Sequence, residues 1–114
     1  METNWGLLDT GYHSAAINMA LDECLLNWQS EGKIPPTLRF YGWSKPTLSI
    51  GYFQRAKTIS FEGIKKHDCD FVRRLTGGSA VLHADELTYS LVISENDPGI
   101  PKSVTKAYYV LTQG

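Results

Sequence analysis

The chain reads Arg73-Arg74-Leu75-Thr76-Gly77-Gly78-Ser79-Ala80-Val81-Leu82-His83 over its most informative stretch. Two adjacent cations lead into a Gly-Gly turn, and an apolar strand candidate follows and ends on a histidine. Glycines let the backbone pass close to a bound group because they carry no Cβ. Guanidinium groups and exposed backbone N–H groups suit a carboxylate, phosphate or thioester oxygen. The residues therefore predict a binding loop for a small anionic or acyl ligand, with a plain hairpin turn and solvated arginines as the structural alternative.

Further motifs lie on both sides of this loop. They are Asn18-Met19-Ala20-Leu21-Asp22-Glu23, Arg39-Phe40-Tyr41-Gly42-Trp43, Pro46-Thr47-Leu48-Ser49-Ile50-Gly51-Tyr52-Phe53-Gln54 and Glu86-Leu87-Thr88-Tyr89-Ser90. In this order and spacing the chain resembles the superfamily of lipoate–protein ligases, octanoyltransferases and biotin ligases. Within that superfamily it is most similar to the Bacillus-type octanoyltransferases that act on the H protein of the glycine cleavage system. The resemblance runs from about Trp5 to the last residue.

The hydrophobic pattern predicts an α+β fold in which a mixed β-sheet packs with helices. A first helix is expected after a Ser14 cap, with one apolar stripe formed by Ile17, Ala20, Leu21, Cys24, Leu25 and Trp28. A short second helix is expected at 60–67, and strands at 5–10, 37–43, 47–53, 71–74, 80–83 and 87–94. The resemblance implies a biotin/lipoate ligase-like fold of the class II synthetase type.

Length and composition narrow the class of protein. A chain of 114 residues forms one domain at most, and its 42% hydrophobic content is enough for a core. The net charge of −1 argues against a nucleic-acid partner, and no apolar run approaches the ~20 residues of a membrane helix. Two cysteines and a polar start at Met1-Glu2-Thr3-Asn4 favour a cytoplasmic protein with free thiols.

The last residues bear on the domain organisation. Residues 103–114 read as a helix with a Ser103 cap, turns are expected at 96–99, and the family resembled is longer than this chain. We therefore expect residues 1–114 to be the N-terminal portion of a single acyltransferase or ligase catalytic domain, so that the fold is truncated.

The ligand contacts are expected in and around the Arg-Arg-Gly-Gly loop. Aromatic and aliphatic side chains supply apolar surface for an acyl chain, with core packing as the alternative: Tyr41, Trp43, Tyr52, Phe53, Val81 and Leu82. By resemblance, the substrate-binding residues are Arg73, Arg74, Gly77, Gly78, Ser79, Ala80, Val81, Leu82, His83 and Trp43. Many ligases have a third glycine where this chain has Ser79, and an aspartate directly after the histidine, where it has Ala84. The Ser79 departure favours acyl transfer over adenylate formation.

Candidate reactive groups are few. His83 is either a general base, a hydrogen-bond donor to the acyl group, or a strand-end histidine bonded to its neighbours. Cys24 is expected to be buried and inert on the first helix, and Cys69 does not match a functional position of the family. The resemblance therefore implies that the catalytic Cys and Lys lie beyond Gly114, and that this chain contains no catalytic residue. His67-Asp68-Cys69 lacks metal-ligand spacing, and no metal site is expected.

The remaining charged residues of interest lie on the first predicted helix and the second predicted strand. Asp22 and Glu23 are adjacent, so their side chains diverge by about 100° on a helix, and we expect flanking or supporting roles rather than paired acid–base work. Arg39 either anchors the second strand or reaches the pocket.

The function expected from the resemblance is octanoyl transfer in protein lipoylation. Octanoate would move from octanoyl-acyl carrier protein to a lysine of a lipoyl-domain protein, such as the glycine cleavage H protein, without a cofactor. The alternative is a lipoate–protein ligase, which would need ATP and Mg²⁺. A non-enzymatic alternative is an acyl-binding module.

Overall fold

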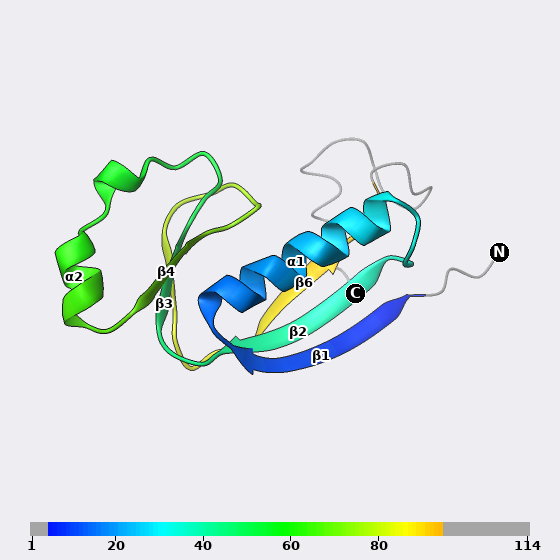
Figure 1. Cartoon of the computed structure of the whole chain (residues 1–114), viewed down its shortest axis with the longest axis horizontal. Coiled ribbons are helices and arrows are strands. Elements are labelled where there is room, and N and C mark those ends of the chain that lie inside the picture. The colour runs from blue at the N-terminus through cyan, green and yellow to red at the C-terminus, as the bar shows by residue number, and fades with distance from the viewer. Residues whose placement is uncertain (1–4, 95–114) are drawn as a thin grey trace.

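The computed structural model describes residues 5–94 of the chain (Figure 1). In chain order the elements are β1 Gly6–His13, α1 Ala15–Ser30, β2 Thr37–Trp43, β3 Thr47–Ile50, the 3₁₀ helix η1 Ala56–Thr58, α2 Phe61–Lys66, β4 Asp70–Arg73, β5 Val81–His83 and β6 Thr88–Val92. Helices and strands mix without strict alternation, which confirms the predicted α+β class. The helix expected at 103–114 and the turn expected at 96–99 lie outside the described residues.

Helix α1 begins where the sequence predicts, because the Ser14 hydroxyl accepts a hydrogen bond from the Ile17 N–H at 3.3 Å. Its buried face differs from the predicted apolar stripe. Four residues of that stripe are exposed: Ile17, Ala20, Cys24 and Trp28. The buried positions of the helix are Ala15, Asn18 and Leu25. Positions 15, 18, 22 and 25 also share one helical face, so α1 turns polar groups toward the sheet, where they find partners in β2.

The first sheet has the strand order β1-β2-β6, with β1 parallel and β6 antiparallel to the central strand. Helix α1 lies across one face of this sheet (Figure 1). The register places Ser90 beside Arg39 and Thr88 beside Tyr41. Because side chains alternate along a strand, Arg39, Tyr41 and Trp43 share the face that α1 covers. This arrangement directs polar groups of β2 and β6 into the space under the helix.

The remaining strands form a second sheet with the order β4-β3-β5, in which β3 is parallel to β4 and antiparallel to β5. The predicted mixed strand pairing is confirmed in both sheets, and the described strands divide between two sheets rather than forming one. Strand β3 has β4 on one side and β5 on the other, so neither edge is free to pair with β2. The resulting second sheet, with α2, lies at one end of the molecule (Figure 1).

Two local expectations in this second sheet have different outcomes. The short helix is confirmed as α2, with the Ser60 hydroxyl accepting from the Gly63 N–H at 3.2 Å and with Lys65 and Lys66 in its last turn. The strand expected at 47–53 ends earlier, at Ile50. Tyr52 instead donates its N–H to the Thr76 carbonyl at 2.8 Å, which ties the chain after β3 to the loop after β4.

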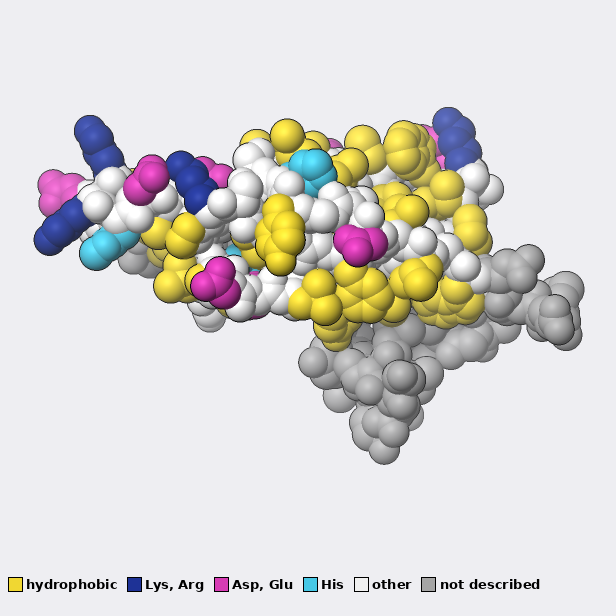
Figure 2. Space-filling view, turned by 90° about the horizontal axis from the view of Figure 1, so that it is seen from below, with side chains coloured by type: hydrophobic (Ala, Val, Ile, Leu, Met, Phe, Trp, Pro, Cys, Tyr) yellow, Lys and Arg dark blue, Asp and Glu magenta, His cyan; other side chains and the backbone are white. Residues whose placement is uncertain are grey.

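The face of the first sheet opposite α1 exposes hydrophobic side chains. Figure 2, which views the molecule from the β1 side, shows them gathered on this face. The largest exposed fractions there are 75% for Tyr12, 73% for Leu87 and 69% for Leu7. Leu38 and Phe40 belong to β2, which lies between β1 and β6, and they are partly buried. We call this set, from β1, β2 and the approach to β6, the outer apolar face.

No helix within residues 5–94 has the length and apolar character needed to cross a membrane.

Candidate functional site

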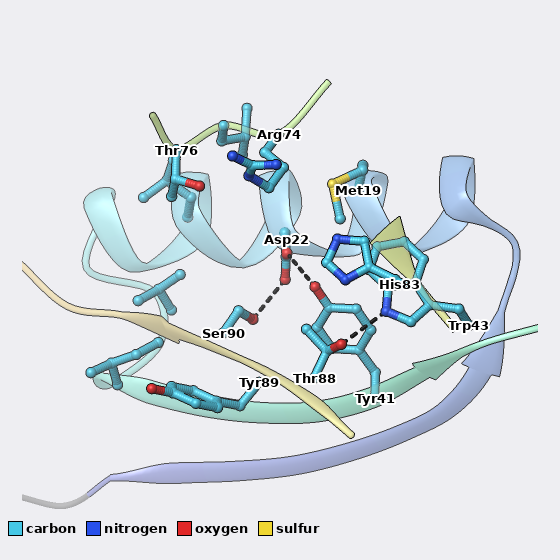
Figure 3. A pocket seen from close by; sticks show the side chains of 14 residues that line it. Met19, Asp22, Tyr41, Trp43, Arg74, Thr76, His83, Thr88, Tyr89 and Ser90 are labelled. Atoms are coloured by element: carbon cyan, nitrogen blue, oxygen red, sulfur yellow. Dashed lines mark hydrogen bonds between the residues drawn. The ribbon is translucent and has the colours of Figure 1, made fainter. Parts of the chain in front are cut away.

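A cavity of about 310 Å³ lies between α1, the inner face of the first sheet and the segment that follows β4 (Figure 3). Its apolar lining consists of Met19, Leu26, Tyr41, Trp43, Leu75, Leu91 and Val92. The other lining residues are Asp22, Arg74, Thr76, His83, Thr88, Tyr89 and Ser90. A mostly apolar wall with a few polar groups is the usual composition of a small-molecule site.

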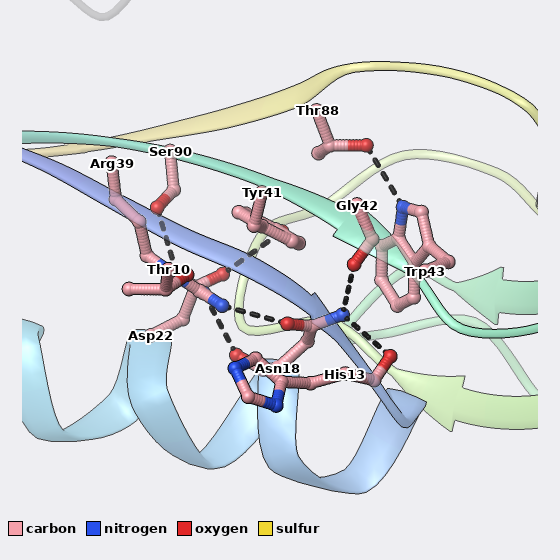
Figure 4. A network of polar contacts seen from close by, with 10 residues as sticks. All are labelled: Thr10, His13, Asn18, Asp22, Arg39, Tyr41, Gly42, Trp43, Thr88 and Ser90. Carbon is pink, nitrogen blue, oxygen red and sulfur yellow. Dashed lines mark hydrogen bonds and ion pairs between the residues drawn. The ribbon is translucent and has the colours of Figure 1, made fainter.

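A buried cation supports the wall of this cavity (Figure 4). The Arg39 side chain is fully buried, and its guanidinium donates to Asp22 Oδ1 at 2.7 Å, Asn18 Oδ1 at 2.7 Å and Thr10 Oγ1 at 2.8 Å. The guanidinium carbon also lies 3.7 Å from the centroid of the Tyr41 ring. These partners satisfy a charge whose burial alone would be costly. Of its two predicted roles, Arg39 therefore takes the first and anchors β2 to α1.

The Asp22 carboxylate is the meeting point of three donors. Besides Arg39, it accepts from Ser90 Oγ at 2.7 Å and from Tyr41 Oη at 3.3 Å (Figures 3 and 4). Burial, and then the nearby Asp22 charge, raise the pKa of Tyr41 far above its ordinary value, although Arg39 acts in the opposite direction. Tyr41 is therefore a neutral phenol that donates to Asp22. The divergence expected of the adjacent acids is confirmed, because Glu23 is exposed.

A second cluster of polar side chains surrounds His83 at the end of β5. Its Nε2 lies 2.8 Å from Ser49 Oγ, and its Nδ1 is hydrogen-bonded to Glu86 Oε1. The imidazole stacks on the Trp43 ring with a centroid distance of 4.4 Å and an interplanar angle of 18°. Trp43 Nε1 in turn donates to Thr88 Oγ1 at 2.8 Å, as Figure 3 shows. Both nitrogens of His83 thus have protein partners in this structure.

The two arginines of the loop donate hydrogen bonds to backbone carbonyls, although Arg73 is exposed and Arg74 is partly buried. Arg73 donates to the carbonyls of Gly51 and Tyr52, each at 3.0 Å. Arg74 donates to the Gly77 and Ser79 carbonyls, each at 2.9 Å, and to Ser49 Oγ at 2.7 Å. Such contacts explain why two adjacent arginines stand before a tight turn. They also leave Arg74, and not Arg73, on the wall of the cavity.

The turn after these arginines packs directly on the end of β3. A Cβ added at Gly51 would lie 2.0 Å from the Gly78 carbonyl oxygen, so only glycine fits at position 51. Gly78 has φ of +99°, which glycine adopts without strain. At Gly77, by contrast, an added Cβ would meet nothing within 4 Å. The backbone approach predicted for this loop is therefore made to the protein's own chain at Gly51.

Only part of the predicted binding set lies at the cavity. Trp43, Arg74 and His83 line it. The other predicted residues lie outside its lining: Arg73, Gly77, Gly78, Ser79, Ala80, Val81 and Leu82. Of the aromatic residues expected to form the pocket, Tyr41 lines it, but Tyr52 and Phe53 are exposed and are not among the lining residues. Their roles as ligand contacts remain predictions.

Several residues that build the site had no predicted role. They are Ser49, Glu86, Thr88 and Ser90, and the organising function of Asp22 was also missed. One signal could have found the serines. Ser49 and Ser90 are polar residues at inward positions of predicted strands, and such residues need a buried partner.

Neither cysteine of the chain lies at the cavity. Cys24 is exposed on α1, which corrects the expectation of a buried thiol, because the helix presents the 15, 18, 22 and 25 face to the sheet instead. Cys69 is partly buried before β4 and is not among the lining residues. Within the described part of the chain, no cluster of three or more His, Cys, Asp or Glu side chains has the arrangement of a metal site.

Comparison with known proteins gives consistent matches. The chain matches the family "Lipoyl protein ligase A/B catalytic domain" over residues 14–114. It is 61% identical over 111 residues to the octanoyltransferase LipM of Geobacillus kaustophilus, an alignment that covers 96% of this chain and 40% of that protein. The chain spans about 40% of the length of the curated relatives that it matches.

Two solved structures have a similar fold. Protein Ta0514 from T. acidophilum with bound lipoic acid is 35% identical, with a TM-score of 0.67, over 86% of this chain and 40% of that one. The bi-partite lipoate protein ligase from Thermoplasma acidophilum, described with its E2 lipoyl domain, is 31% identical, with a TM-score of 0.62, over 79% of this chain and 36% of that one.

Proposed function

Because this chain belongs to the lipoyl protein ligase A/B catalytic domain family, we propose that it forms the acyl-binding part of an octanoyltransferase of protein lipoylation. The observation that carries the proposal is the cavity under α1. Its volume of about 310 Å³ falls at the lower end of small-molecule sites, roughly 300–1,000 Å³. An unbranched acyl chain is a ligand of matching size and polarity for such a cavity.

The lining suggests how the acyl group lies. Met19, Leu26, Leu75 and Val92 offer aliphatic contacts for the hydrocarbon chain. Arg74 is the cation in the described lining, and we assign it to the thioester oxygen of the donor. Binding would be supported by the loop contacts that already fix the Arg74 guanidinium, because an immobilised donor loses little entropy when the ligand arrives.

The transfer itself needs a nucleophile. A thiolate would attack the thioester carbonyl of octanoyl-acyl carrier protein, and the carrier thiolate would leave. The amine of a lysine on a lipoyl-domain protein would then attack the new thioester, form an amide, release the thiolate and lose its proton. Cys24 and Cys69 are the two cysteines of this chain, and neither lines the cavity. We therefore place the reactive cysteine and its lysine partner in residues that this sequence does not contain.

We infer the donor, the acceptor and the cellular compartment from the chemistry of the transfer. The acceptor is a lipoyl-domain protein, for which the glycine cleavage H protein is our specific candidate, and the donor is octanoyl-acyl carrier protein. Transfer from a thioester requires no ATP, metal ion or other cofactor. We place the reaction in the cytoplasm, which suits the free thiols of Cys24 and Cys69.

The likeness to Ta0514 with lipoic acid and to the bi-partite ligase favours one alternative, an ATP-dependent lipoate–protein ligase. A chimera separates the two functions. In it, this chain replaces the matching residues of the G. kaustophilus octanoyltransferase LipM. The chimera is given octanoyl-acyl carrier protein and an apo lipoyl domain, with and without ATP, and the lipoyl domain is weighed intact. Octanoylation without ATP supports the transferase, whereas modification only from free acid and ATP replaces it with the ligase.

A point series on the same chimera tests the loop. We expect Arg74→Ala, and Arg73→Ala through loss of loop support, to raise the KM for the acyl donor by about tenfold, the equivalent of one charge-assisted hydrogen bond. Lys65→Ala on α2 is the control, because Lys65 is exposed and lies outside the cavity lining. Equal KM values for all three variants would remove the loop from the site. If the 114-residue chain binds octanoate but the chimera transfers nothing, the acyl-binding module replaces both enzymatic alternatives.

A further inference from the structure

The donors around His83 form a directed chain. The Arg74 guanidinium donates to Ser49 Oγ at 2.7 Å, and a guanidinium has no acceptor. Ser49 Oγ must therefore accept from Arg74, and its single proton needs another acceptor. Ser49 is fully buried, and among the described residues the other partner of its hydroxyl is His83 Nε2 at 2.8 Å. The Ser49 proton accordingly points to Nε2, which must carry a lone pair.

This assignment fixes the other side of the imidazole. A neutral histidine has one protonated nitrogen, so Nδ1 carries the proton and donates it to Glu86 Oε1. A protonated Nε2 would turn both Arg74 and His83 into donors toward Ser49 and would leave the Ser49 proton without an acceptor in the described surroundings. If both nitrogens were protonated, the imidazolium would also be a second cation on the same hydroxyl. The contacts at Nε2 and at Nδ1 are therefore both consistent with the neutral tautomer that carries its proton on Nδ1.

A second chain of donors ends on the same carboxylate. Trp43 Nε1 donates to Thr88 Oγ1 at 2.8 Å, and Thr88 Oγ1 donates to Glu86 Oε1 at 3.0 Å. The stacking of Trp43 on His83 places the two chains side by side. Glu86 is thus the common end of a path from the loop, through Arg74, and a path from β2, through Trp43. Glu86 is not among the residues that line the cavity.

We propose that Glu86 is a positioning residue of the site, which holds His83 as the neutral Nδ1–H tautomer and, through Ser49, holds Arg74 and the turn at 77–79 in place. In this arrangement the Nε2 lone pair is occupied by the Ser49 hydroxyl, so His83 is not the base of the reaction. It presents its ring to the cavity beside Trp43. The functional consequence rests on the acyl-binding role proposed above, but the tautomer does not.

The first test needs no substrate. The 114-residue chain is labelled with nitrogen-15 histidine, and two-bond proton–nitrogen correlation spectra at neutral pH report which ring nitrogen is protonated. We expect His83 to show a protonated Nδ1 and an unprotonated Nε2. An Nε2–H tautomer, or an imidazolium with both nitrogens protonated, would overturn the proposal. His13 and His67 give reference signals, assigned by His→Gln variants.

Two variants then test whether the contacts from Glu86 and Ser49 determine the tautomer of His83. In Glu86→Gln the acceptor of Nδ1–H loses its charge, and in Ser49→Ala the donor to Nε2 is removed, so each is expected to bring a measurable population of the Nε2–H tautomer. Glu23→Gln is the matched control, because Glu23 is an exposed acid on α1, and it should leave the His83 signals unchanged. An unaltered tautomer in folded Glu86→Gln and folded Ser49→Ala would contradict the role of Glu86.

The effect of the same variants on octanoate binding is measured separately. Titration with octanoate should give a dissociation constant about tenfold higher for Glu86→Gln than for the wild type, as for one weakened charge-assisted bond, and an unchanged constant for Glu23→Gln. Equal constants for Glu86→Gln and wild type would show that the tautomer does not position the acyl site. If the wild type binds no octanoate, the acyl-binding proposal fails, while the tautomer spectra still decide the assignment of Glu86.

Discussion

At the scale of the residue, the cavity depends on how two charges are satisfied beneath it. The Arg39 side chain is fully buried, and Asp22 is partly buried, with 18% of its side chain exposed. Each has several hydrogen-bond partners, and no buried side-chain nitrogen or oxygen of the described residues lacks one. A buried pair of this kind adds little net stability compared with apolar packing, but losing one partner leaves the other charge uncompensated.

That asymmetry gives the first prediction. Asp22→Asn should lower the free energy of unfolding by about 3 kcal/mol, because the Arg39 guanidinium would remain buried without a counter-charge. Chemical denaturation of the two proteins measures the difference. Glu23→Gln, on the exposed side of the same helix, should change stability by less than ~0.5 kcal/mol. Equal losses for the two variants would show that the Arg39–Asp22 pair is not the origin of the effect.

Tyr41 gives a pH dependence with a definite sign. Its pKa is raised in the folded protein from the ordinary value of 10.0, first by burial and then by the Asp22 charge. Above that pH the folded state retains a proton that the unfolded state has lost, so stability falls as pH rises. Between pH 10 and 11, the wild type should lose about 1 kcal/mol more than Tyr41→Phe in urea unfolding, because the unfolded tyrosine is already half ionised at pH 10. Parallel pH profiles for the two proteins would contradict the raised pKa.

At the scale of the element, the sequence predicted single helices and strands better than their contacts. The cap and terminal charges of α2 are local signals, and they sufficed to place it. The buried side of α1 could not be read from hydrophobicity, because Asn18 and Asp22 face partners from Arg39 and Ser90, which lie far along the chain. For the same reason, the motif predicts a binding loop but does not predict the contacts that anchor this loop to the rest of the chain.

The packing of that loop on β3 yields a matched pair of variants. Gly51→Ala would place a Cβ 2.0 Å from the Gly78 oxygen and 2.9 Å from its carbonyl carbon, and neither backbone atom can move without displacing the turn. We expect the free energy of unfolding to fall by about 2 kcal/mol, as for other overpacked positions. Gly77→Ala meets nothing within 4 Å and should be close to neutral. Thermal denaturation tests both, and a neutral Gly51→Ala would show that the turn is loosely held.

At the scale of the whole molecule, the two faces of the first sheet differ. The inner face is covered by α1 and holds the polar network and the cavity, whereas the outer apolar face is open in the described part of the chain (Figure 2). The division of the strands between two sheets could not be foreseen from sequence. Alternation within a strand indicates which residues share a side, but it carries no information about which strand pairs with which.

The outer apolar face leads to the last prediction, that two copies of the 114-residue chain associate through it. Leu7 and Leu87 are 69% and 73% exposed, and contiguous apolar surface of this kind drives association in water. Sedimentation velocity over a range of concentrations should show a concentration-dependent increase in mass. The double variant Leu7→Lys/Leu87→Lys should shift this increase to concentrations about tenfold higher or abolish it, because a charged group would have to be desolvated at the contact. Phe53→Lys is the control, since Phe53 is 86% exposed but lies after β3, away from the first sheet. A wild type that stays monomeric, or an equal effect of Phe53→Lys, would show that the outer apolar face does not mediate self-association.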